Sequence, residues 1–275
     1  MAALRISRRS FERQYRDRAK TLLKLARDLP DRPSPADIHE LRVTARRIQV
    51  MRRLLPRGVR RSQESGRFGL ALKSVLMATS QLRDSDTLLD TLGAHKGSIP
   101  SEILVKLENQ RSDMAARAKV ATNLIAEVPA LDPDSLRIRG KRISRRLQKR
   151  IRQQGRLAAK LLPTVLGDES KVTELHSLRK DVKKLRYLLE LADKSPPELP
   201  IMTRWQDSLG SIHDFDVAAS YLRSQPDHAA DGTVRELLRT RHSRYLKFVN
   251  EYMTDSMGTL AGSDILAGGP IPLSP

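Results

Sequence analysis

Apolar residues recur every three or four positions along almost the entire chain, a spacing that places them on one face of an α-helix. No stretch shows the strict alternation of apolar and polar residues that is typical of a half-buried β-strand. The pattern therefore predicts an all-α protein. Its eight predicted helices span residues 11–29, 35–55, 72–82, 103–125, 143–161, 175–189, 205–221 and 237–249.

The second of these helices has a sharply defined start. Pro33 helps to interrupt the first helix, and Ser34 has the short hydroxyl side chain that caps a helix N-terminus. Pro35 suits the first helical position, where a backbone N–H would have no partner, and Asp37 places a negative charge in the first turn. We expect this helix to begin at Pro35 and to stop near Pro56.

This second helix and the sixth share a motif of basic residues. The sequence HELRVTARRI begins at His39, and HSLRKDVKKL begins at His176. In each, basic residues follow the histidine after three, seven and eight positions, and offsets of three and seven return to the same helix face. Each helix therefore has a cationic face, which indicates a polyanionic ligand. The first face comprises His39, Arg42, Arg46 and Arg53 with Gln49, and the second comprises His176, Arg179, Lys183 and Arg186.

The repetition extends beyond these two helices. Leu82–Asp86 (LRDSD) matches Ile212–Asp216 (IHDFD) at an offset of 130 residues, and Leu107–Arg111 matches Leu237–Arg241 at the same offset. We therefore expect two homologous four-helix units. Residues 1–130 form the predicted first unit and residues 131–257 the second, with the joint near 129–140. The Gly-, Pro- and Ser-rich residues 258–275 form a predicted disordered tail.

Composition narrows the possible functions. The formal charge of +19 and the pI near 10.7 indicate an anionic partner, such as nucleic acid, acidic lipid or polyphosphate. The absence of cysteine excludes disulfides, thiolate metal sites and cysteine nucleophiles. Aromatic residues make up only 4% of the chain, which disfavours recognition of bases by stacking. Neither a GxxxxGK[S/T] nor a GxGxxG motif occurs, so the usual phosphate-binding loops of nucleotide enzymes are missing.

No apolar run is long enough to span a bilayer, and the Arg-rich N-terminus has no apolar stretch that a secretory signal requires. We therefore expect a cytoplasmic protein.

These motifs resemble the CHAD domain, the conserved histidine α-helical domain, over roughly residues 9–253. The resemblance rests on HELRVTARRIQVMRRLL from His39, HSLRKDVKKLRYLLEL from His176, and the following segments LRDSDTLL and LGSIHDFDV. It implies two four-helix bundles related by a pseudo-twofold axis, whose basic helices line a central cavity that binds inorganic polyphosphate. The sequence departs from the family pattern at Ser80, where Gly is usual, and at His213, where Arg is usual.

Some relatives also carry a triphosphate-tunnel enzyme domain, and its strands with alternating Glu and Lys do not occur in this sequence. The resemblance therefore implies a stand-alone binding module, associated with polyphosphate granules in the cytoplasm.

We expect the ligand to be bound without catalysis, cofactor or metal ion. Arginine suits phosphate because its planar fork donates two parallel hydrogen bonds, lysine adds a mobile point charge, and histidine adds a further donor. The predicted polyphosphate-binding residues are His39, Arg42, Arg46, Arg47, Arg53, Lys73, His176, Arg179, Lys183, Lys184 and Arg186. Within the two cationic faces, Arg42, Arg46, Lys183 and Arg186 are expected to face the ligand rather than to pair with buried acidic residues.

A second basic run extends from Arg137 to Lys160 and contains no acidic residue. Two interpretations remain open: it extends the polyphosphate site, or it forms a nonspecific surface patch. The patch is represented by Arg142, Arg145, Arg146 and Lys149.

The histidines and the paired aspartates also have interpretations as metal ligands. For His39 and His176 we favour hydrogen-bonded side chains at a helix start, with phosphate contact as the functional alternative. For the two DxD segments we favour aspartates that cap helices and orient the arginines of the cationic faces. These segments are Asp84–Asp86 and Asp214–Asp216.

Two rival functions remain. A basic helical protein also suits nonspecific, weak binding of nucleic acid, although the sequence has no helix-turn-helix or RNA-recognition motif. A phosphatase or kinase acting on phosphate polymers would need an assembled nucleophile, an acid–base pair or a Mg²⁺ site, and no convincing set is visible. The sequence leaves the oligomeric state open.

Overall fold

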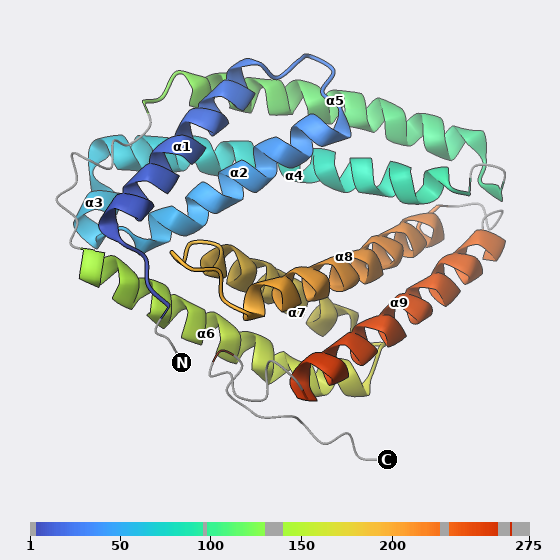
Figure 1. Ribbon diagram of the computed structural model, residues 1–275. Helices are drawn as coiled ribbons and strands as arrows, with labels where there is room; N and C mark the ends of the chain where they lie inside the picture. Colours follow the sequence, from blue (N-terminus) through green and yellow to red (C-terminus); the bar gives the residue numbers. More distant parts are fainter. Residues whose placement is uncertain (1–3, 96–97, 130–139, 226–230, 258–264, 266–275) are drawn as a thin grey trace. The chain divides into compact units, whose positions relative to one another are not determined.

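The computed structural model describes residues 4–95, 98–129, 140–225, 231–257 and 265. These residues form nine α-helices and no β-strand, which confirms the all-α fold class (Figure 1). The chain divides into an N-terminal unit, Ser7–Ile143, and a C-terminal unit, Met1–Ile6 with Ser144–Pro275. The N-terminal unit contains α1 (Arg8–Arg27), α2 (Pro35–Leu54), α3 (Arg57–Arg61), α4 (Gln63–Gly93) and α5 (Ser101–Ala126). Helix α6 (Gly140–Gly167) leads into the C-terminal unit, which contains α7 (Val172–Leu189), α8 (Glu198–Arg223) and α9 (Asp231–Met257).

The start of α2 follows the sequence prediction. Ser34 is the N-cap, and its hydroxyl accepts a hydrogen bond from the backbone N–H of Asp37 at 3.2 Å. The Asp37 carboxylate accepts one in return from the backbone N–H of Ser34 at 2.8 Å. This capping box satisfies two backbone donors at once, and Pro35 occupies the first turn as expected. The helix that carries the first cationic face therefore has a fixed beginning.

The short helix α3 was not predicted. It has five residues, none of them buried, so it presents no apolar periodicity from which a helix could be recognised. Helix α4 is longer than predicted, with 31 residues, and it includes the segment Asp84–Asp86 in its last third.

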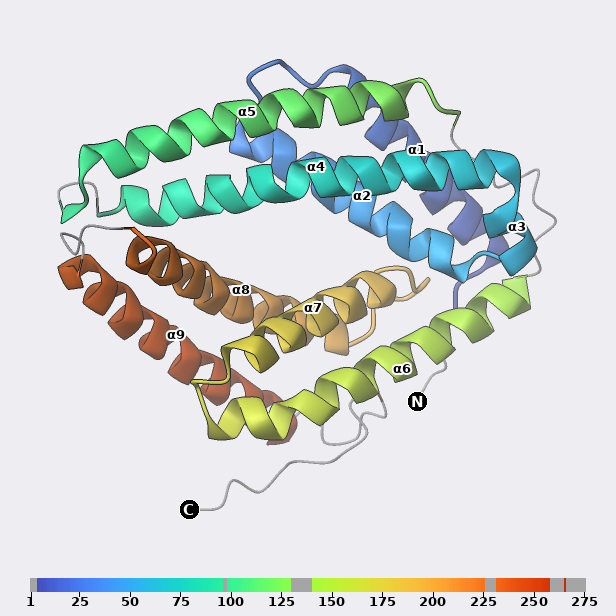
Figure 2. The same cartoon turned by 180° about the vertical axis from the view of Figure 1, so that it is seen from behind.

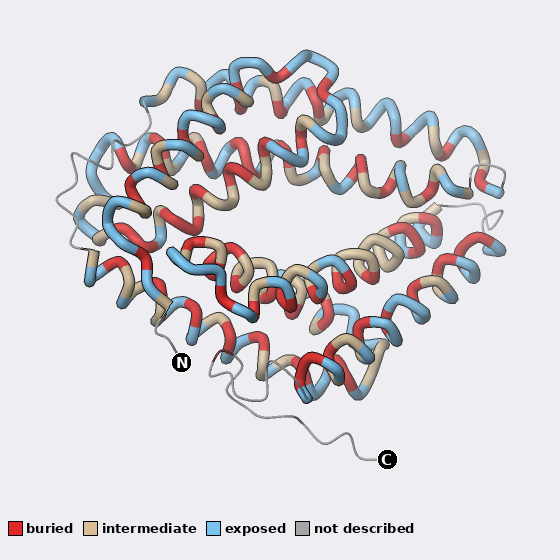
Figure 3. Tube along the Cα trace, viewed as in Figure 1, coloured by how far each residue is buried: buried red, intermediate tan, exposed pale blue. Residues whose placement is uncertain are grey.

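Each unit buries its own apolar core (Figure 3). In the N-terminal unit, α4 packs against α2 and α5, and α1 packs against the same two helices. Phe11, Tyr15, Leu41 and Phe68 are fully buried there. Because the apolar side of α2 faces this core, its opposite side is left for polar residues.

In the C-terminal unit, α8 packs against both α7 and α9, and Figures 1 and 2 both show α7 beside α8. Leu178 of α7, Trp205 of α8 and Phe248 of α9 are fully buried. The Trp205 indole N–H donates a hydrogen bond to the Asp255 carboxylate at 2.9 Å, which satisfies the one polar atom of that ring. Helix α7 is thus anchored on its apolar side in the same way as α2.

Residues near the N-terminus belong to the C-terminal unit. The backbone N–H of Ile6 donates to the Ser144 hydroxyl at 3.2 Å, and that hydroxyl donates to the Ile6 carbonyl at 2.8 Å. The Gln148 amide donates to the Leu4 carbonyl at 2.8 Å. The backbone N–H of Asp193, beyond the end of α7, donates to the Arg5 carbonyl at 2.8 Å. The segment 4–6 therefore connects α6 to the segment that follows α7.

Most of the predicted joint at 129–140 lies outside the described residues, and so does the predicted tail at 258–275 except for Ile265. None of the helices described here is apolar over enough of its length to cross a bilayer.

Candidate functional site

The first cationic face lies on α2, and Lys73 lies on α4, which packs against α2. His39 and Arg53, near the two ends of the face, are exposed, as is Lys73. Arg46 and Arg47 are half-buried. Because the apolar side of α2 is held in the core, these cations keep a fixed direction relative to the N-terminal unit.

Arg42 of this face is held by the packing of α2 against α4. Its Nη1 donates to the Leu76 carbonyl at 3.1 Å and to the Thr79 hydroxyl at 3.0 Å, both on α4. Its Nη2 lies 3.4 Å from the Ser80 hydroxyl. Arg42 therefore joins α2 to α4 while carrying its positive charge, so it has a structural role in addition to the predicted binding role.

The second cationic face lies on α7, where His176, Arg179 and Lys183 are all half-buried. Lys184, also predicted as a binding residue, forms an ion pair with Asp181 one turn earlier at 3.0 Å. The cations of this face are less exposed than His39 and Arg53 of α2. Their side chains lie at the boundary between solvent and the packed helices of the C-terminal unit.

Arg186 of the second face contacts an acidic residue that is half-buried rather than fully buried. Its guanidinium forms an ion pair with Glu190 and donates through Nε to the Gln206 side chain of α8 at 2.7 Å. The guanidinium also lies 4.5 Å from the centre of the Tyr187 ring. Glu190 is one turn further along the chain, just after the last residue of α7, so the pair forms locally. The Arg186 guanidinium therefore contacts side chains of both α8 and the chain segment at the end of α7.

Two histidines meet at the beginning of the second face. The Nδ1 atom of His176 lies 3.1 Å from the Nδ1 atom of His213 on α8, and the ring centres are 4.4 Å apart. One ring must donate and the other accept, so the neutral pair shares a single Nδ1 proton. Burial, and secondarily the charges of Arg179, His176 and Lys180, lower the pKa of His213 to about 4. Burial also lowers the pKa of His176, followed by the charges of Lys180 and Arg179.

Arg111 links the DxD segment of α4 to the chain just before the first basic helix. Its Nε donates to the buried Asp86 carboxylate at 2.6 Å, and its Nη2 donates to the Pro33 carbonyl at 2.7 Å. Pro33 lies two residues before the first residue of α2. The arginine of α5 therefore anchors the beginning of that helix.

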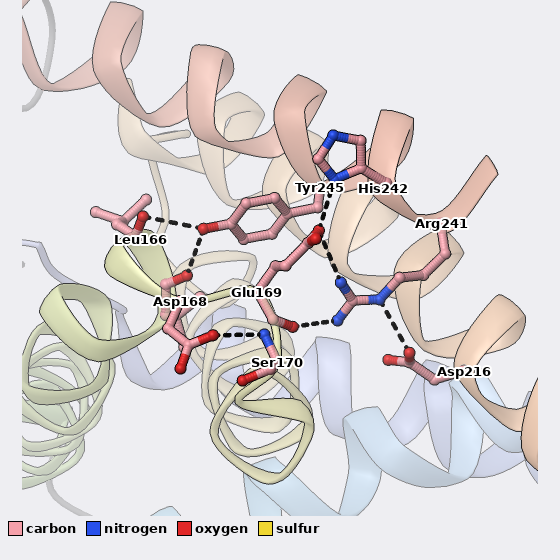
Figure 4. Close-up of polar contacts among 9 residues, drawn as sticks. Leu166, Asp168, Glu169, Ser170, Asp216, Arg241, His242 and Tyr245 are labelled. Atoms are coloured by element: carbon pink, nitrogen blue, oxygen red, sulfur yellow. Dashed lines mark hydrogen bonds and ion pairs between the residues drawn. The ribbon is translucent and has the colours of Figure 1, made fainter. Parts of the chain in front are cut away.

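Arg241 makes the same connection in the C-terminal unit (Figure 4). Its Nε donates to the Asp216 carboxylate at 3.0 Å, and its Nη2 donates to the Glu169 carbonyl at 2.5 Å, just before α7. Its Nη1 also pairs with the Glu169 carboxylate at 3.0 Å, which in turn lies 2.8 Å from Nδ1 of His242. Tyr245 adds hydrogen bonds from its hydroxyl to two carbonyls at the end of α6, at 2.9 and 3.0 Å.

We call these two arrangements the arginine clamps: Arg111 with Asp86, and Arg241 with Asp216. The expectation that the DxD segments cap helices is wrong, because both segments lie inside α4 and α8. The second aspartate of each segment holds an arginine of the following helix rather than one of the cationic faces. Sequence reasoning recognised the repeated segments containing Arg111 and Arg241 but assigned the arginines no role.

The second basic run lies on α6. Arg142, Arg145 and Lys149 are exposed, whereas Arg146 is half-buried. Arg137 and Arg139 lie outside the described residues. Among the residues that the structure describes, no three His, Asp or Glu side chains come together as a possible metal site.

Comparison with known proteins identifies one family. The family model described as "CHAD domain" matches residues 11–223. The chain is also similar in structure to the crystal structure of the CHAD domain from the plant Ricinus communis, with a TM-score of 0.52 and 15% sequence identity. That similarity covers 99% of this chain and 96% of the plant chain, and at this identity it shows the fold alone. No curated protein matches the sequence.

Proposed function

The chain belongs to the CHAD domain family, and we propose that it binds inorganic polyphosphate through the cationic faces of α2 and α7, without catalysis. The observation that carries this proposal is that both faces are built at corresponding positions and both are anchored by an arginine clamp. If the basic residues of α2 and α7 only kept the protein soluble, the chain would not need an equivalent arginine clamp before each of the two helices.

The chemistry of the faces suits a polymer of phosphate. Polyphosphate has about one negative charge per residue and no base edges, so a protein recognises it by charge and by donors to its oxygens. The depressed pKa values of His176 and His213 support a positive potential at the α7 face, since Arg179 and Lys180 contribute to both shifts. An anion placed there would gain electrostatic energy from groups already fixed by folding.

We propose binding rather than turnover because the best candidate carboxylates are otherwise engaged. A phosphatase or kinase of phosphate polymers needs carboxylates free to hold Mg²⁺ beside the phosphates. Asp86 and Asp216 instead neutralise Arg111 and Arg241. Their role in the structure is to hold the helices that carry the cationic faces.

The proposal predicts a large difference between polymer and monomer. Long-chain polyphosphate should bind much more tightly than orthophosphate, because one polymer engages several cations at once. Its affinity should fall by about 10³-fold between roughly 50 and 200 mM salt, since each neutralised phosphate releases a counterion. Isothermal titration at several salt concentrations measures both effects. Equal competition by orthophosphate at the same phosphate concentration, or an affinity independent of salt, contradicts the proposal.

The histidine pair predicts a dependence on pH. Because the folded pKa of each histidine lies below the unfolded value near 6.5, the free protein loses stability as pH falls from about 6.5 towards 4, where the unfolded chain binds more protons. Bound polyphosphate has the opposite effect, since an anion favours the charged imidazole. Polyphosphate affinity should therefore rise as pH falls through the same range.

The variant His213→Gln provides the control for this prediction, because glutamine keeps a hydrogen-bonding group beside His176 but does not titrate. Both the melting temperature and the polyphosphate affinity should depend less on pH in the variant. Parallel pH profiles for the parent and the variant would show that the pair does not titrate in this range.

A further inference from the structure

Helix α6 carries a row of cations that the proposed polyphosphate faces do not include. Basic residues recur every three or four positions from Arg142 to Lys160, so they lie on one side of the helix. All residues of the row are exposed. At 1.5 Å per residue the row is about 27 Å long. It comprises Arg142, Arg145, Lys149, Arg152, Arg156 and Lys160.

This row faces away from the protein interior. The buried side of α6 is apolar and includes Ile143, Leu147, Ile151 and Ala158, each no more than 2% exposed. With 3.6 residues per turn, the centre of the cationic row lies about 180° around the helix from the centre of this buried side. The row is therefore held outward by folding and needs no rearrangement to meet a partner.

The charges of the row are not neutralised along the helix. No acidic residue occurs between 135 and 167. Within the parts of the chain that the structure describes, none of the six side chains in the row forms an ion pair. Like charges one helical turn apart repel each other, and an external polyanion removes that repulsion.

The basic surface is also wide. Lys141 and Arg150 are exposed on opposite flanks of the row, and half-buried Arg146 lies on the same flank as Arg150. With these three, basic residues cover an arc of about 180° around the helix. A thin flexible polymer contacts only one line along such a convex surface. A partner with two rows of phosphates contacts both flanks at once. Duplex nucleic acid has this geometry, because its major groove is about 12 Å wide and an α-helix lying along it has a phosphate backbone on either side.

We propose that the outer face of α6 binds the phosphate backbone of duplex nucleic acid, independently of base sequence. Helix α6 has no aromatic residue, so it has no platform on which the bases of a single strand could stack. Its apolar side is buried in the protein, so it cannot insert into a lipid surface as an interfacial amphipathic helix does. The rigid duplex also loses little conformational freedom when it binds along the row.

The test compares two charge-matched variants of the full chain. In the α6 variant, Arg145, Lys149, Arg152 and Arg156 are replaced by Gln, which has a similar helix propensity. In the control variant, four exposed cations of α9 are replaced in the same way: Arg235, Arg239, Arg244 and Lys247. Binding of a labelled mixed-sequence DNA duplex is measured by fluorescence anisotropy at about 0.1 M salt. Circular dichroism and melting temperature check that both variants fold.

The α6 variant should bind the duplex at least about 100-fold more weakly than the parent, and the slope of log affinity against log salt should become shallower by about 3.6. The control variant should stay within about 5-fold of the parent, because it has the same net charge but keeps the row. Both variants should retain polyphosphate binding, since the faces on α2 and α7 are unchanged.

Three results would overturn the proposal. Equal duplex affinity in the two variants would show that net charge alone governs binding. Loss of polyphosphate binding in the α6 variant, with duplex binding kept, would assign the row to polyphosphate. Loss of binding to anionic phospholipid vesicles, with duplex binding kept, would assign it to membranes. The duplex measurements do not depend on the faces of α2 and α7, so failure of those faces to bind polyphosphate in the parent protein would contradict only the proposed function.

Discussion

Replacing Arg46, Arg53, Lys73 and Lys183 together by Gln is expected to lower the affinity for long-chain polyphosphate by about 10³-fold or more. A hydrogen bond to a charged group contributes about 1.5–3 kcal/mol, and four of them are removed here. The stems of the side chains remain, so packing changes little. The melting temperature should change by no more than about 8 °C, because a substitution outside the core usually changes stability by no more than about 0.5 kcal/mol and the four together by about 2 kcal/mol.

The choice of residues in this variant follows from the contacts in the two faces. Arg42 and Arg186 are left unchanged because Arg42 joins α2 to α4 and Arg186 is paired with Glu190 and Gln206. Removing either would mix a folding defect with a binding defect. The control is again the α9 variant, which removes the same number of charges. If the two variants bind polyphosphate equally well, the cationic faces are not the binding site.

Replacing Arg241 by Met is expected to reduce the free energy of unfolding by about 3–5 kcal/mol, because it removes one partner of a buried ion pair and leaves the other charge buried without a partner. The side chain of Arg241 is only 7% exposed, and that of Asp216 is 13% exposed. Burial already raises the pKa of Asp216, and Arg241 opposes that increase. Without the guanidinium, the carboxylate and the Glu169 carbonyl both lose their donors.

Denaturant unfolding measures this loss, and Arg244→Met on the same helix is the matched control. Arg244 is exposed, so its replacement should cost no more than about 0.5 kcal/mol. The corresponding change Arg111→Met should destabilise the N-terminal unit in the same way, because Arg111 binds Asp86 at the equivalent position. A cost below about 1 kcal/mol for Arg241→Met would mean that the clamp is dispensable for folding.

The sequence was sufficient to predict the fold class and the start of α2. Periodicity reports which side of a helix is apolar, and Ser34 with Asp37 defines a helix start from local chemistry alone. Both properties lie within one helix or its cap, so they do not depend on knowing which helices pack together. Helix α3 escaped detection because it is short and buries no residue.

The partners of the site residues could not be predicted, because they come from neighbouring helices. The contact between His176 and His213 depends on the rotation of α7 against α8, and the bond from Arg42 to Leu76 depends on how α2 meets α4. The repeat did indicate that Arg111 and Arg241 were equivalent. It did not indicate that each would reach back to the chain before a basic helix.

The hydrogen bonds of residues 4–6 to α6 have a consequence for the order in which the chain folds during synthesis. The N-terminal unit ends at Ile143, so its helices can pack as soon as that much of the chain has emerged. Leu4 and Ile6 are made before that unit, but their partners Ser144 and Gln148 are made about 140 residues later. At a rate of chain synthesis of about 5–20 residues per second, Leu4 and Ile6 are made roughly 7–30 s before their partners. Segment 4–6 is therefore synthesised before the N-terminal unit but reaches its native position after it, and a nascent-chain protease assay should find the segment accessible until α6 has emerged.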